Sequence, residues 1–286
     1  MRMRLLLAPL AALLVAAPLA SATPITTEMV LTSADGFTLK GTLALPLAKP
    51  KAKVPVVILA HQFRSDRTGW APLIEKLLAR GIGTLALDLR GHGASTLKGG
   101  TEVAVSADFA TSATAVGFDK IPADLAQAAA WLRQQPGVDG RRIGLAGSSV
   151  GAFSVLLAAP EVKPLAILSL SPAGTGAFGN DARERLKGAL LRGRATVLVL
   201  TSNGDKDALE NAKALEALPG VAVNFKDGEE HGFAYLKDRV DLMAVFFGEY
   251  LTYHHTGKAS ATRRAKAPAA ASATTEGVTG QAPTEK

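Results

Sequence analysis

The chain has 286 residues, of which 48% are hydrophobic and 20% charged, so a sizeable core is available and wholesale disorder is excluded. It contains no cysteine, which excludes disulfides, cysteine nucleophiles and thiolate metal sites. The net charge of +7 comes mostly from the two ends. The nearly neutral residues 23–255 are a poor match for a nucleic-acid-binding surface, so no nucleic-acid partner is expected.

The first residues resemble an export signal. Arg2 and Arg4 precede an apolar run, and the small residues at 20–22 follow it. This order is typical of a secretory signal peptide, here cleaved after Ala22. The apolar run is shorter than the roughly 20 residues of a membrane-spanning helix, although an uncleaved anchor remains the alternative. We therefore predict an exported protein, periplasmic or secreted, whose mature form is not attached to a membrane.

The next residues predict strands. Two strands are predicted at 26–33 and 37–45, joined by Ala34-Asp35-Gly36, a good turn sequence. Residues 54–60 form a continuous apolar run, typical of a strand buried on both faces. After this point predicted helices and strands alternate. The further strands are expected at 82–87, 142–146, 165–170, 195–201 and 221–225. The helices are expected at 69–80, 122–135, 149–159, 181–191, 207–218 and 235–253.

This alternation predicts an α/β fold with a mostly parallel, twisted sheet of about eight strands and helices on both faces. An eight-stranded barrel is the competing architecture. The opening hairpin has no helix between its strands, which favours an open sheet with an antiparallel N-terminal edge.

Two stretches lack the pattern of a helix or a strand. Residues 90–120 form a long excursion rich in Gly, Ser and Thr, and long excursions are often functional. From residue 256 onward Ala, Thr, Ser, Lys and Pro dominate, which predicts a disordered tail. The expected organisation is a signal peptide at 1–22, one domain at 23–255 and a tail at 256–286.

A nucleophile motif lies where a predicted strand gives way to a predicted helix. The sequence Gly147-Ser148-Ser149-Val150-Gly151 has the G-x-S-x-G pattern in the strand–turn–helix context that it requires. The glycines leave room for a strained central residue whose oxygen is held above the sheet edge. Spacing selects Ser149, which lies two residues from both glycines.

A serine nucleophile needs a base, and the base needs an acid. His231 lies between the last predicted strand and the last helix, at the same sheet edge as Ser149. His92 in a glycine turn and His254 and His255 at a helix end are better explained by structural roles. Asp205 and Asp207 both follow the strand at 195–201, and Asp205 is also placed to cap the next helix.

Together these motifs resemble the α/β-hydrolase superfamily, in the lidless group of dienelactone-hydrolase-like proteins and small serine esterases. The resemblance implies the order nucleophile, acid, histidine. It selects Asp207, because the family acid follows a strand-ending glycine by three residues, as Asp207 follows Gly204. It also matches His231-Gly232-Phe233.

The resemblance further implies an oxyanion hole made of the backbone N–H groups of Phe63 and Val150. The family usually has His-Gly where this chain has His61-Gln62. Glycine adopts positive φ at low cost, so Gln62 is the main departure from the family pattern. The turn from Asp88 to Ser95 also matches a family turn that is usually structural.

The resulting prediction is a serine hydrolase that cleaves small carboxylic esters, with short acyl groups, through an acyl-enzyme. An amidase or peptidase is the first alternative, for which Glu229-Glu230 gives a faint hint. A non-catalytic binding protein is the second, although the intact Ser149, Asp207 and His231 argue against it. No metal-ligand cluster or phosphate-binding loop is evident, so no metal or cofactor is expected. The sequence predicts no particular oligomeric state.

Overall fold

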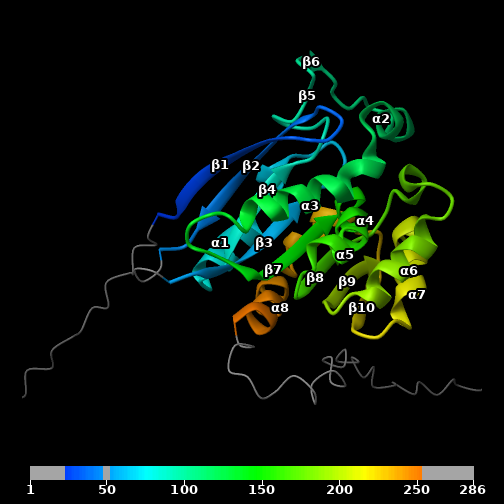
Figure 1. Ribbon diagram of the computed structural model, residues 1–286. Helices are drawn as coiled ribbons and strands as arrows, with labels where there is room; N and C mark the ends of the chain where they lie inside the picture. Colours follow the sequence, from blue (N-terminus) through cyan, green and yellow to red (C-terminus); the bar gives the residue numbers. More distant parts are fainter. Residues whose placement is uncertain (1–22, 48–51, 253–286) are drawn as a thin grey trace, which may run out of the picture.

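The computed structural model describes residues 23–47 and 52–252. The predicted signal peptide at 1–22 and tail at 256–286 lie outside the described residues. One large sheet runs through the molecule (Figure 1). Its strands are β1 (Ile25–Thr32), β2 (Thr38–Leu45), β3 (Val54–Ala60), β4 (Gly83–Asp88), β7 (Val138–Ser148), β8 (Ala166–Leu170), β9 (Thr196–Ser202) and β10 (Val221–Lys226).

The strands are arranged in the order β1-β2-β4-β3-β7-β8-β9-β10. Strand β2 is antiparallel to β1 and to β4, and every other neighbouring pair in this sheet is parallel. The predicted open, mostly parallel sheet with an antiparallel N-terminal edge is therefore confirmed.

Helices cover both faces of the sheet (Figure 1). They are α1 (Ala71–Ala79), α2 (Phe109–Val116), α3 (Ile121–Leu132), α4 (Val150–Leu157), α5 (Ala159–Val162), α6 (Ala182–Arg192), α7 (Lys206–Glu216) and α8 (Val240–Thr252). The described part of the chain also contains the 3-10 turns η1 (Arg67–Trp70), η2 (Phe118–Lys120), η3 (Thr175–Phe178) and η4 (Gly232–Leu236). None of these helices is long and apolar enough to cross a membrane.

Alternating side chains of the central strands fill two separate cores. In β3, Val57 and Leu59 pack with residues of α1 and α8 on one face. Their neighbours Val56 and Ile58 pack with residues of α3, α4, α6 and α7 on the other. Because both faces are covered, the strand has no polar side, which explains its continuous apolar sequence.

The excursion at 90–120 is more ordered than the sequence predicted. It contains the short hairpin of β5 (Leu97–Lys98) and β6 (Thr101–Glu102) and the helix α2. The Asp108 side chain caps α2 by accepting a hydrogen bond from Thr111 N at 2.7 Å. Gly117, at φ 76°, ends the helix. The prediction that residues 90–120 contain no helix or strand was wrong. The Asp108 cap and Gly117 mark the two ends of a helix that consists mostly of small residues.

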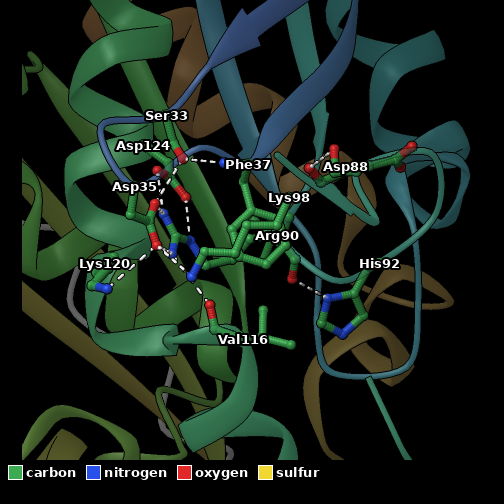
Figure 2. A network of polar contacts seen from close by, with 12 residues as sticks. Ser33, Asp35, Phe37, Asp88, Arg90, His92, Lys98, Val116, Lys120 and Asp124 are labelled. Carbon is green, nitrogen blue, oxygen red and sulfur yellow. Dashed lines mark hydrogen bonds and ion pairs between the residues drawn. The ribbon is translucent and has the colours of Figure 1, made fainter. Parts of the chain in front are cut away.

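The turn after β4 is built around a buried arginine (Figure 2). Arg90 is 1% exposed, and its guanidinium forms two hydrogen bonds with Asp124, at 2.7 and 2.8 Å. It also contacts Asp35, at 3.0 and 3.1 Å, and Lys98 and Lys120 reach the same carboxylate. Burial raises the pKa of Asp124, whereas the Arg90 guanidinium is the main cause that lowers the pKa of Asp35. All of these charges are paired, so this turn is structural.

Candidate active site

The register of the parallel strands brings several loops to one edge of the sheet. Ala60 at the end of β3 is paired with Gly147 of β7. Ser148 is paired with Leu170 of β8, which in turn is paired with Leu200 of β9. Because these strands run the same way, the segments that follow them leave at the same edge. Ligands of open α/β sheets bind at this edge.

Ser149 forms a sharp turn between β7 and α4. Its backbone has φ 55° and ψ −119°, a strained conformation for a residue with a side chain. The turn is possible because two glycines surround it. A Cβ on Gly147 would collide with the Gly151 backbone, and a Cβ on Gly151 would collide with the Ala60 carbonyl. The predicted elbow is therefore present in the structure.

Exposure separates the two serines of the motif. Ser148 is fully buried, and its hydroxyl donates a hydrogen bond to Gln62 Oε1 at 2.9 Å. Ser149 is partly exposed and lies at the N-terminus of α4, where the helix dipole favours negative charge. Of the two serines, only Ser149 is open to solvent.

His231 lies in the loop after β10 and is paired with Asp205. His231 Nδ1 lies 2.7 Å from Asp205 Oδ2, so an Nδ1–H donates to the carboxylate, and Nε2 has no hydrogen-bond partner among the described residues. The Asp205 side chain is 11% exposed and that of His231 is 40% exposed. A shielded carboxylate thus orients an imidazole that is open to solvent.

The assignment of Asp207 as the acid was wrong, because Asp207 faces another loop. Its Oδ2 accepts hydrogen bonds from the backbone N–H groups of Gly174 and Thr175, at 2.7 and 3.3 Å. Its Oδ1 accepts one from the Thr175 hydroxyl at 2.9 Å. Asp207 therefore holds the loop that follows β8, and it makes no contact with His231.

The start of α7 explains this two-residue difference. The helix begins at Lys206, so Asp207 is already helical, whereas Asp205 lies just before the helix with a non-helical backbone (φ −83°, ψ 81°). The two side chains therefore point to different loops. The predicted capping role of Asp205 is also wrong, since its side chain makes no capping hydrogen bond. Gly204 N instead donates to Gly228 O at 2.8 Å, which holds the start of α7 against the histidine loop.

The two predicted oxyanion donors have no competing acceptor among the described residues. Among the described residues, the backbone N–H of Phe63 donates no hydrogen bond to another backbone group. Val150 is the first residue of α4, and an N–H at that position has no acceptor within its own helix. Both groups lie at the edge that carries Ser149.

His61 holds the peptide that carries the Phe63 N–H. Its Nε2 accepts a hydrogen bond from Leu89 N at 3.0 Å, so its proton is on Nδ1, which donates to Gln62 O at 2.7 Å. Complete burial, and then the neighbouring His92, lowers the pKa of His61 to about 3, so the ring is neutral at pH 7. A trans peptide is planar, and fixing the Gln62 carbonyl therefore fixes the direction of the Phe63 N–H.

Gln62 does not need the positive φ that the family glycine suggested. Within the described chain the non-glycine residues with positive φ are Arg64, Ser149, Lys163 and Ser171. The side chain of Gln62 instead contacts Ser148 and Phe233. The expected strain at this half of the oxyanion hole is absent. The contacts of His61 and Gln62 could not be predicted from sequence spacing. The sequence indicated these two residues only through their position directly after β3.

Other candidate groups have partners of their own. His92 Nδ1 lies 3.0 Å from Arg90 O, in agreement with a role in the turn. Glu230 forms an ion pair with Lys226 at 2.8 Å, so it is not a free carboxylate for binding an amine. Among the described residues no group of three His, Cys, Asp or Glu side chains is arranged to hold a metal ion.

Comparisons with known proteins agree with this geometry. The sequence matches the alpha/beta hydrolase family over residues 57–277, which is most of the chain. The chain belongs to the alpha/beta hydrolase family. No curated protein sequence matches this family member.

Several solved structures share the fold of this alpha/beta hydrolase. A dienelactone hydrolase from Anabaena variabilis superposes with a TM-score of 0.60 at 21% identity, covering 80% of this chain and 100% of that one. Acetyl xylan esterase 1 from Thermoanaerobacterium gives 0.61 at 17%, covering 82% and 86%. A Pyrococcus furiosus esterase gives 0.57 at 19%, covering 80% and 92%. At these identities the likeness shows the shared fold.

Proposed function

We propose that this protein is a serine hydrolase that cleaves carboxylic esters. The observation that carries the proposal is the strained, partly exposed Ser149 at the same sheet edge as the His231–Asp205 pair. Two structural neighbours, the acetyl xylan esterase and the Pyrococcus furiosus protein, are esterases by name. A peptidase or amidase is the alternative, but of the two glutamates that favoured it, Glu230 is paired with Lys226.

The proposed reaction has two stages. Ser149 Oγ attacks the ester carbonyl carbon while its proton passes to His231 Nε2, and the negative charge on the carbonyl oxygen is stabilised by the N–H groups of Phe63 and Val150. The tetrahedral intermediate collapses, and the leaving alkoxide takes the proton from His231. Water then attacks the acyl-enzyme, with His231 again taking the proton. As the bond to Ser149 Oγ breaks, His231 returns the proton to that oxygen and the acid is released. Asp205 keeps the His231 proton on Nδ1 and stabilises the imidazolium.

A fluorophosphonate probe tests this proposal, because it reacts with an activated serine. The protein should be labelled on Ser149, as located by mass spectrometry, and should hydrolyse p-nitrophenyl acetate. Ser149→Ala should lose both properties. Ser154→Ala is the matched control, because Ser154 lies one turn further along the same helix and is fully buried, with its hydroxyl donating to Val150 O. Labelling of Ser149→Ala at the wild-type rate would refute the proposal.

We also propose that the enzyme is exported and that its signal peptide is cleaved after Ala22. The support is the pattern of Arg2, Arg4, the apolar run and the small residues before Thr23. N-terminal sequencing of the exported protein should begin at Thr23. A soluble mature protein that still carries Met1 would contradict this.

A further inference from the structure

The side chain of Gln62 connects three loops of the active site. Its Oε1 accepts a hydrogen bond from Ser148 Oγ at 2.9 Å and another from Phe233 N at 2.9 Å. Ser148 directly precedes Ser149, and Phe233 lies two residues after His231. Gln62 itself directly precedes Phe63. One oxygen atom therefore links the segments that carry the nucleophile, the base and an oxyanion donor.

The orientation of this amide is fixed by its partners. A backbone N–H can only donate, so the Gln62 atom that faces Phe233 N is the carbonyl oxygen and not the nitrogen. The Ser148 hydroxyl then donates to the same oxygen. The backbone carbonyl of Gln62 also accepts a hydrogen bond, from His61 Nδ1 at 2.7 Å, so both carbonyl oxygens of this residue have donors.

The close approach of the histidine loop to Gln62 requires a glycine. Gly232 has φ 55°, and a Cβ at this position would collide with Gln62 Oε1 and lie 2.6 Å from Ser148 Oγ. Gly232 N also donates to Ser171 Oγ at 3.0 Å. The residues next to Ser149 and His231 in the chain are thus packed directly against each other and against Gln62.

We propose that Gln62 is a positioning residue that fixes the elbow, the histidine loop and the Phe63 N–H relative to one another. This inference rests on the proposed serine hydrolase function. Alignment of these groups matters in the transition state more than in the bound substrate. Loss of the Gln62 acceptor should therefore lower kcat and leave KM nearly unchanged.

The test compares two near-isosteric variants. Gln62→Met removes the acceptor, whereas Gln62→Glu keeps an oxygen that can accept both hydrogen bonds. With p-nitrophenyl acetate, Gln62→Met should lower kcat by about 10- to 100-fold, the order of loss expected for a misplacement of about 1 Å. Gln62→Glu should keep most of the wild-type kcat. Rates are expressed per folded molecule, determined from circular dichroism and thermal melts.

Two further variants distinguish positioning from general stability. Gln127→Met makes the same chemical change on α3, where Gln127 Nε2 donates to Thr32 O at 2.8 Å, and it should leave kcat unchanged. The double variant Ser148→Ala/Gln62→Met should lose no more activity than Gln62→Met alone, because both changes remove the same hydrogen bond. Additive losses would contradict a direct link between these residues.

The possible failures are separable. If wild type fails to hydrolyse the ester or to react with the probe, the proposed function itself is refuted. If wild type is active and Gln62→Met keeps the wild-type kcat, or loses activity only through a higher KM, the positioning role of Gln62 is refuted. Equal losses in Gln62→Met and Gln62→Glu would also overturn it, because the acceptor would then be irrelevant.

Discussion

His231 Nδ1 and Asp205 Oδ2 lie 2.7 Å apart, and they join the loops that follow two neighbouring strands, β10 and β9. In the proposed mechanism, this contact leaves Nε2 of His231 as the atom that exchanges protons with the substrate. It also leaves Asp207, on the first turn of α7, to hold the loop that follows β8. Asp205 and Asp207 are two residues apart but contact different loops, and substituting each in turn should give different effects.

We predict that Asp205→Asn abolishes most activity while the protein stays folded. An asparagine at this position favours the wrong tautomer of His231, and the comparable change in another triad enzyme costs on the order of 10⁴ in kcat. Asp207→Asn should keep most activity and lower the free energy of unfolding by about 1 kcal/mol, because hydrogen bonds to a half-exposed carboxylate weaken. Steady-state kinetics and urea unfolding of both variants check this. An inactive Asp207→Asn beside an active Asp205→Asn would refute it.

The buried Arg90–Asp124 pair provides a stability prediction. Asp124→Asn leaves the guanidinium of Arg90 buried without its bidentate partner (Figure 2). We expect the free energy of unfolding to fall by about 1–3 kcal/mol, because Asp35 still pairs with Arg90, with little change in kcat of the folded fraction. The exposed pair of Glu184 and Lys187 supplies the control, and Glu184→Gln should change stability little. Equal effects of the two substitutions would show that burial of the pair is unimportant.

Because His61 is buried, we predict that the protein loses stability on acidification at pH values well above those at which carboxylates take up protons. Its pKa is lowered from 6.5 to about 3 in the folded chain, so below pH 6.5 the unfolded chain binds a proton that the folded chain does not. Stability should therefore be unaffected above pH 6.5 and fall as the pH drops below it. His61 contributes up to about 1.4 kcal/mol per pH unit, and His92 adds to the effect because burial also lowers its pKa.

Urea unfolding at about pH 7.5, 6 and 5 measures this dependence. His61→Gln should be less stable at neutral pH, because it disturbs the contacts to Leu89 and Gln62, but it should show a shallower loss on acidification. Identical slopes in wild type and His61→Gln would contradict the prediction.

The sequence predicted the fold well because each buried strand of the parallel region is apolar on both faces. It also predicted the elbow, since the glycines at 147 and 151 are required by local crowding. It failed to predict α2, although Asp108 and Gly117 supplied the cap signals at its two ends. Small residues with weak helical periodicity fill the space between them.

The acid and the Gln62 contacts were harder to predict for a different reason. Choosing between Asp205 and Asp207 depends on the exact first residue of α7, and helix boundaries are uncertain by one or two residues from sequence alone. The contacts of Gln62 join residues that are 86 and 171 positions apart. No local spacing rule contains such pairs, because they arise only when the parallel strands bring their ends to one edge.

Two aromatic rings beside the elbow predict a preference for short acyl groups. Phe63 and Phe109 meet edge to face with 5.2 Å between ring centroids. The tip of Phe109 lies against Gly174, where an added Cβ would be 2.8 Å from the ring and 3.6 Å from Val150 Cβ. Between β8 and β9 the chain has only η3 and α6, so no larger cap is available there to cover a long chain.

A series of p-nitrophenyl esters from acetate to decanoate tests this preference. Each methylene that finds an apolar surface contributes about 0.8 kcal/mol, or about fourfold in kcat/KM, so kcat/KM should stop rising where the pocket ends. We expect the maximum at a short acyl chain in wild type and at a longer one in Phe109→Ala, which removes one of the two rings beside the elbow. Trp131→Ala, a partly buried aromatic on α3, is the control and should keep the wild-type optimum. A wild-type maximum at decanoate, or an unchanged optimum in Phe109→Ala, would show that these rings do not limit the acyl site.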